Sequence, residues 1–263
     1  MRILIKAKLL ILIFLVLITA ASSKAFAQGS NGLRYLDSTI KFDASRACGA
    51  SDSASFIKNN FELIHFPGNQ NFRNHFFRTI YFANDLFGLG DDRPDVLFYD
   101  DWKSPNAYAI KGGANENNVV IFGATTIAKL SYSYPGTNNL NTAAINGLIG
   151  HEFGHIAQYK FGYNGNVKNM ELMADAISGL LIYAERDFTE AQELGLFLAQ
   201  EAAYNSGDFA YTSPTHHGTP NERLAAFKYG YNVAKNYMNN DVVRIGAFMR
   251  DSAKKFGVPN INR

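Results

Sequence analysis

The sequence predicts an α+β domain that is mainly helical and has a small β-sheet ahead of a long helix at residues 141–162. Short branched and aromatic runs typical of strands lie at residues 95–99, 107–111 and 118–122. Apolar residues recur at helical spacing at residues 69–86 and through most of the chain after residue 141. No linker or internal repeat divides the chain, so we expect residues 28–263 to form a single domain.

Start and stop signals bound the predicted helices. Residues 69–86 carry an apolar stripe, Phe72, Phe76, Phe77, Ile80 and Leu86, and Gly88, Gly90 and Pro94 follow. Asn141 and Thr142 are the expected cap of the long helix. Further helices are expected at residues 170–187, 190–204, 220–238 and 241–256, with Thr189 and Thr219 as caps and Pro220 in a first turn.

The first 27 residues have the pattern of a secretory signal peptide. Arg2, Lys6 and Lys8 precede an apolar run at residues 9–21, and Ala25-Phe26-Ala27 follows as a cleavage site. The mature chain would begin at Gln28 and be exported, to the periplasm or the medium. An uncleaved anchor on the outer face of the inner membrane is the alternative, but the run of 13 residues is shorter than the about 20 that a spanning helix needs.

Charge and cysteine content exclude several classes of protein. The full chain has 25 basic and 23 acidic residues, and removal of Arg2, Lys6, Lys8 and Lys24 with the leader leaves 21 against 23. A nearly neutral mature chain lacks the dense basic surface that nucleic acid requires. The single cysteine, Cys48, cannot form an internal disulfide, so the core, a metal or both must hold the fold.

Residues 151–155, HEFGH, form the HExxH pattern inside the long helix. Residues four apart lie on one helix face, so His151 and His155 can reach one ion while Glu152 points beside it. Catalytic zinc takes three protein ligands and leaves a fourth position open. The alternative is a surface helix with two solvated histidines, but the surrounding residues are strongly apolar, and burying these polar groups without partners would be costly.

A third ligand is expected on the next helix. Residues 171–175, ELMAD, place Glu171 and Asp175 one turn apart at what we expect to be the start of that helix. Glu171 can complete the metal site, and Asp175 can accept the free N–H of a ligating histidine. The competing interpretation is an ordinary acidic helix start, which the helix dipole favours.

Together, HEFGH and ELMAD resemble the HExxH and ExxAD motifs of the gluzincin metalloendopeptidases, the family that includes the CAAX prenyl proteases, HtpX-like membrane proteases and their soluble periplasmic relatives. Residues 106–109 and 119–123 are similar to the family's substrate-edge strands, and residues 217–223 to its downstream His-Pro segment. The resemblance covers residues 106–227. Gly218 stands where many relatives have proline, the loop between His155 and Glu171 is short, and the membrane helices of the integral members are missing.

The resemblance implies a zincin-type metalloprotease domain, with His217 and Arg223 as candidates for stabilising the oxyanion. An ordinary loop at a helix start, with Arg223 paired to an acid, is the alternative for these two residues. Residues 118–122 are the candidate edge strand for an extended peptide, although their composition also suits an internal strand. Membrane substrates are not implied for a chain without the membrane helices.

From these residues we predict an exported zinc endopeptidase acting on proteins or peptides, with Glu152 as general base and no stable membrane insertion once the leader is cleaved. The rival is a zinc-stabilised binding or chaperone-like module in which a protein ligand such as His217 closes the metal site. An open fourth position would favour the enzyme.

Overall fold

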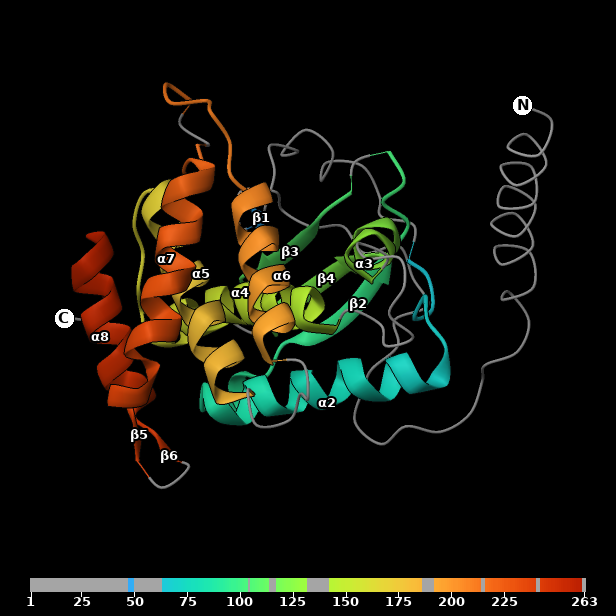
Figure 1. Cartoon of the computed structure of the whole chain (residues 1–263), viewed down its shortest axis with the longest axis horizontal. Helices are drawn as coiled ribbons and strands as arrows, with labels where there is room; N and C mark the ends of the chain where they lie inside the picture. Colours follow the sequence, from blue (N-terminus) through green and yellow to red (C-terminus); the bar gives the residue numbers. More distant parts are fainter. Residues whose placement is uncertain are drawn as a thin grey trace. The chain divides into compact units, whose positions relative to one another are not determined.

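The structure, a computed structural model, describes residues 47–49, 63–103, 105–113, 117–131, 142–185, 192–213, 216–239 and 242–261. These residues belong to one compact unit, Tyr35–Arg263. The predicted signal peptide at residues 1–27 and the predicted caps Asn141 and Thr189 lie outside the described residues. The described part joins a small sheet to a larger set of helices, so the predicted α+β class is confirmed (Figure 1).

The elements follow the predicted order with some additions. The helices are α2 (Gln70–Leu86), α3 (Ala124–Ser131), α4 (Thr142–Lys160), α5 (Val167–Ala184), α6 (Gln192–Asn205), α7 (Pro220–Val233) and α8 (Ile245–Phe256). The strands are β1 (Ala47–Gly49), β2 (Asp95–Tyr99), β3 (Ala107–Ile110), β4 (Val119–Gly123), β5 (Met238–Asn239) and β6 (Val242–Val243). The described residues also include the 3-10 turns η2 (Gly90–Asp92) and η4 (Ala234–Asn236).

The main sheet has the strand order β1-β3-β4-β2. β4 is parallel to β2 and antiparallel to β3, so both of its sides are paired. The prediction that residues 118–122 form an edge strand is therefore wrong. Four of the five residues of β4 are buried, as expected for an internal strand covered on both faces.

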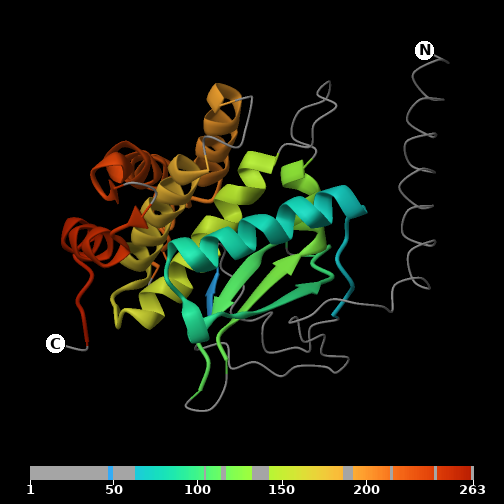
Figure 2. The ribbon, with the colours of Figure 1, turned by 90° about the horizontal axis from the view of Figure 1, so that it is seen from below.

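Helix α2 lies across one face of this sheet (Figure 2). The side chain of Asn69 caps the helix by accepting a hydrogen bond from the backbone N–H of Phe72, at 2.9 Å. Phe76 is fully buried, and its ring meets those of Phe122 and Phe98 at centroid distances of 5.2 and 5.7 Å. The predicted apolar stripe is the core contact of α2, with Leu86 only partly buried.

Helix α4 is surrounded by protein on almost every side, which confirms that its apolar sequence marks a buried helix. Its packing against α5 depends on a small residue at the crossing. A Cβ at Gly150 would lie 2.9 Å from the Cα of Ser178, closer than side chains pack. The Ser178 hydroxyl donates to the carbonyl of Gly147 at 2.7 Å and joins the two helices at the same level.

Several helix ends differ from the prediction. α5 begins at Val167 with Asn166 as its cap, so Glu171 lies in the second turn rather than at the helix start. α7 ends at Val233, and a hairpin of β5 and β6 replaces the end of one predicted helix and the start of the next. The two branched valines of β6 favour a strand over a helix at this point.

Helix α3 was not predicted. The carboxylate of Asp101, which precedes it by more than 20 residues, accepts from the backbone N–H groups of Thr125 and Thr126 at 2.5 and 3.1 Å. The cap of α3 therefore comes from a distant residue rather than from the local sequence. Among all the helices of the described part, none is both long enough and apolar enough to span a membrane.

Candidate metal centre

The two histidines of the HExxH segment meet on one face of α4. Their Nε2 atoms lie 3.2 Å apart, and the planes of their rings are at 90°. His151, Glu152 and His155 are all buried, which removes the interpretation of two solvated histidines on a surface helix. The spacing of four residues thus places both rings on one face of the helix, as helix geometry predicts.

Glu171 reaches this pair from α5. Its Oε2 lies 3.2 Å from Nε2 of His151, and its Oε1 lies 3.3 Å from Nε2 of His155. In a tetrahedral zinc site with ligand bonds of about 2.0–2.1 Å, neighbouring ligand atoms are about 3.3–3.4 Å apart. The donor atoms of His151, His155 and Glu171 therefore have the types and spacing that hold such an ion.

The carboxylate of Glu171 shows a second sign of an ion site. It is fully buried, and within the described chain neither oxygen makes a hydrogen bond. Burial alone would raise the pKa of Glu171, but His155 and His151 outweigh it and hold the pKa well below its ordinary value. An anionic carboxylate facing two imidazole nitrogens without hydrogen bonds is a donor set that a divalent cation fits.

Asp175 lies one turn after Glu171 and supports the first histidine. Its Oδ1 is 2.9 Å from Nδ1 of His151, which leaves Nε2 of that ring for the metal. Burial opposes a charge on His151, but the neighbouring carboxylates of Asp175 and Glu171 raise the pKa of its imidazole to about 10 in the metal-free chain. The structure thus places Asp175 where the predicted supporting contact requires it.

Arg223 on α7 contacts the carboxylates of both Asp175 and Glu171. Its Nε and Nη2 donate to the two oxygens of Asp175, the second at 3.0 Å, and Nη1 lies 3.3 Å from Oε2 of Glu171. Arg223 is 1% exposed, and burial, which alone would lower its pKa, is outweighed by Asp175 and Glu171, which raise it. Arg223 therefore contacts both Glu171, a predicted ligand, and Asp175, the residue that supports the predicted ligand His151.

Glu152 lies beside the two histidines with no exposed surface. Within the described residues, neither of its carboxylate oxygens makes a hydrogen bond. Burial is the largest cause that raises the pKa of Glu152, to about 8; the neighbouring Glu171 carboxylate adds to this effect, while His151 and Arg223 oppose it. The structure brings the predicted general base next to the predicted ligands.

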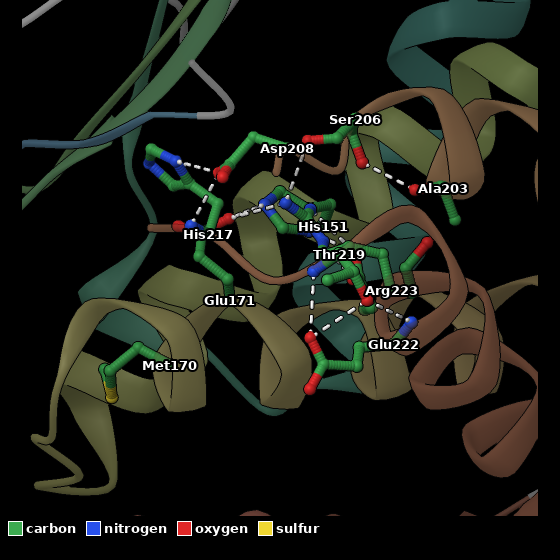
Figure 3. A network of polar contacts seen from close by, with 12 residues as sticks. His151, Met170, Glu171, Ala203, Ser206, Asp208, His217, Thr219, Glu222 and Arg223 are labelled. Atoms are coloured by element: carbon green, nitrogen blue, oxygen red, sulfur yellow. Dashed lines mark hydrogen bonds and ion pairs between the residues drawn. The ribbon is translucent and has the colours of Figure 1, made fainter. Parts of the chain in front are cut away.

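His217 lies on the loop between α6 and α7, and its partner is Asp208 on the same loop (Figure 3). The backbone N–H of His217 donates to Oδ2 of Asp208 at 2.8 Å, and Nδ1 of its ring lies 3.5 Å from that oxygen. Although burial opposes the charged carboxylate, the N–H of His217 and the ring of His216 lower the pKa of Asp208 to about 2. Among the described residues, His217 is not in the group of histidine and acidic donors that converges on one point.

Two polar residues of this region were not predicted. Gln158 contacts Nδ1 of His155, and its position three residues later in the same helix is a signal that could have found it. Asp208 stands in a loop without periodicity, and no pattern in the sequence connects it to His217.

The comparisons agree with the geometry. Residues 81–204 match the sequence model of peptidase family M48, and this range contains α4, the first two ligands, Glu171 and Asp175. No match to the chain was found among curated proteins or among solved structures. The segment at residues 81–204, in which α4 and α5 assemble the ligand group, is therefore of the peptidase family M48 type, a family of metallopeptidases.

Proposed function

We propose that this protein is an exported zinc-dependent endopeptidase. The observation that carries the proposal is the convergence of Nε2 of His151, Nε2 of His155 and the carboxylate of Glu171, at 3.2–3.3 Å from one another, inside a segment that matches a metallopeptidase family. Three protein ligands of this kind with an open fourth position are typical of catalytic rather than structural zinc.

His151, His155 and Glu171 would hold the ion. When bound, zinc supplies Lewis-acid chemistry that polarises a carbonyl and makes water nucleophilic at neutral pH. Glu152 is the general base: its carboxylate accepts the proton of the attacking water and later delivers it to the leaving nitrogen. Its place directly after His151 in α4 supports this role.

Stabilisation of the oxyanion is assigned to His217, with Arg223 as a second candidate. The part-buried hydrogen bond to Asp208 fixes the backbone of His217, which supports a role as a preorganised donor. The guanidinium of Arg223 is occupied by Asp175 and Glu171, contacts that support a role in holding the ligands in place.

Substrates are proposed to be proteins or peptides, as for other metallopeptidases. Binding of an extended peptide along β4 is not part of the proposal, because β2 and β3 already pair with that strand. Export is proposed from the signal-peptide pattern of residues 1–27. An N-terminal residue of Gln28 in the exported protein is the expected result, whereas an intact leader would indicate the anchored form.

Metal analysis and proteolysis test the activity together. The chain from Gln28 should carry about one zinc per molecule and digest casein or a peptide library, and a chelator should abolish the digestion. Glu152→Ala should retain zinc and fold but lose proteolysis. Glu185→Gln is the matched control, since Glu185 is a buried glutamate outside the ligand group. Full activity of Glu152→Ala would refute the role of Glu152.

A further inference from the structure

A single amide side chain links the second histidine to the helix that carries the third ligand. Gln158 lies in the last turn of α4 and has no exposed surface. Its Oε1 is 2.9 Å from Nδ1 of His155, and its Nε2 donates to the backbone carbonyl of Met170 at 2.8 Å. Met170 directly precedes Glu171 in α5.

These two contacts determine the tautomer of His155. A backbone carbonyl can only accept a hydrogen bond, so the amide nitrogen of Gln158 must face Met170 and the amide oxygen must face His155. That oxygen can only accept, so Nδ1 of His155 carries the proton. The lone pair of the ring is then on Nε2, the atom that faces His151 and Glu171.

The same amide also links two predicted ligands that belong to different helices. His155 is on α4 and Glu171 is on α5, and the Gln158 side chain contacts the ring of His155 and the backbone carbonyl of Met170, the residue before Glu171. Asp175 contacts Nδ1 of His151 as Gln158 contacts Nδ1 of His155. The support of His151 is a carboxylate that Arg223 neutralises, whereas the support of His155 is a neutral amide. The two histidines thus have chemically different supports.

We propose that Gln158 is a positioning residue. It holds His155 as its Nδ1–H tautomer and links that histidine to the backbone just before Glu171, so that His155 and Glu171 present their donor atoms to one ion. This inference rests on the proposed zinc site. Groups that support a metal-ligating histidine typically contribute 10–100-fold in metal affinity, and we expect an effect of that order for Gln158.

The test compares three variants. Gln158→Met keeps the length of the side chain and removes both hydrogen bonds. Gln158→Glu keeps an acceptor for Nδ1 but turns a second acceptor toward the Met170 carbonyl. Ser178→Ala is the matched control, because Ser178 is equally buried and joins the same two helices through Gly147 without touching a ligand.

Two measurements separate positioning from general stability. Nitrogen NMR of the metal-free protein reports which ring nitrogen of His155 is protonated, and competition with a chromophoric chelator reports zinc affinity. Gln158→Met should lose the uniform Nδ1–H tautomer and bind zinc about 10–100-fold more weakly. Gln158→Glu should retain the tautomer and lose affinity, and Ser178→Ala should change neither readout.

Three outcomes would overturn the inference: wild-type His155 protonated on Nε2, zinc affinity unchanged in Gln158→Met, or an equal loss in Ser178→Ala. A wild-type protein with the expected tautomer but no affinity for zinc would instead overturn the proposed function. The tautomer is measured without metal, so the two failures are distinguishable.

Discussion

A further buried carboxylate, that of Glu185, lies at the C-terminal cap of α5 and is not in the group of predicted metal ligands. Its Oε2 accepts a hydrogen bond from Nδ2 of Asn146 at 2.8 Å, and Asn146 in turn contacts His75 and Thr79 of α2. Burial raises the pKa of Glu185 to about 7, against the favourable effects of Thr79, Asn146 and Arg78. In the same cluster burial lowers the pKa of His75.

The raised pKa predicts that Glu185 makes folding less favourable as the pH rises. The folded state keeps the proton up to about pH 7, whereas the unfolded chain releases it near its ordinary value of 4.5. Between these values the folded state binds more protons, so its stability falls by about 1.4 kcal/mol per pH unit and becomes level above pH 7.

Urea unfolding of metal-free wild type and Glu185→Gln at several values between pH 4.5 and 8 measures this contribution. The difference between the two proteins should decline across that range, because the variant lacks the titrating group. His75 contributes to both proteins and cancels in the comparison. A difference that is independent of pH would show that the carboxyl of Glu185 titrates normally when folded.

At the residue scale, local spacing made part of the site predictable. His151 with His155 and Glu171 with Asp175 are each four residues apart, and helix geometry alone places such pairs on one face. Arg223 is 48 residues from Asp175, and Asp208 is in a loop, so their contacts depend on how α7 packs and no local pattern encodes them. The resemblance predicted Arg223 as a site residue, whereas Asp208 was not predicted.

At the scale of elements, the crossing of α5 and α7 depends on a glycine. A Cβ at Gly230 would overlap the carbonyl oxygen of Ala176, so the two helices can approach only because position 230 has no side chain. This approach brings the start of α7, with Arg223, to the carboxylates of α5. The capping box of Thr219 and Glu222 fixes where that helix begins.

Gly230→Ala should therefore lower the free energy of unfolding by about 1–3 kcal/mol or more, the usual cost of overpacking a core. Gly246→Ala is the control: in α8 its Cβ would meet its nearest neighbours at 3.8–4.0 Å, an ordinary contact. Because alanine is the better helix former, that variant should gain up to about 1 kcal/mol. If chemical denaturation showed the same change in the free energy of unfolding for both substitutions, the close approach of α5 and α7 at Gly230 would be contradicted.

The existence of most elements was predictable from periodicity, but strand pairing was not. Composition described residues 118–122 equally well as an edge or an internal strand, and only the parallel partner β2 decides between them. Helix α3 was missed because its cap comes from Asp101, and the β5–β6 hairpin was missed because its strands are two residues long. Contacts distant in sequence determine the first two, whereas the hairpin is local but too short to give a periodic pattern.

At the scale of the whole molecule, the proposed zinc ion would join α4 to α5 through His151, His155 and Glu171. A ligand that binds only the folded state stabilises it by an amount that grows with the logarithm of its concentration. Zinc at about 1,000 times its dissociation constant should raise the free energy of unfolding by about 4 kcal/mol. Thermal unfolding with and without a chelator measures the difference.

Glu171→Gln provides the comparison, because it keeps the size of the third ligand and removes its charge. Its unfolding midpoint should respond far less to zinc than that of the wild type. A wild-type midpoint that does not change with zinc would show that the ion does not bind the folded chain through these residues.

The position of Arg223 late in the sequence has a consequence for synthesis. Domains form from the N-terminus as the chain leaves the ribosome, so both histidines and the two acids of α5 emerge well before the arginine that neutralises Asp175. Until α7 is made and docks, the nascent chain holds a pair of carboxylates without that counter-charge. A helix that is synthesised after α4 and α5 therefore completes the electrostatic balance around the predicted ligands.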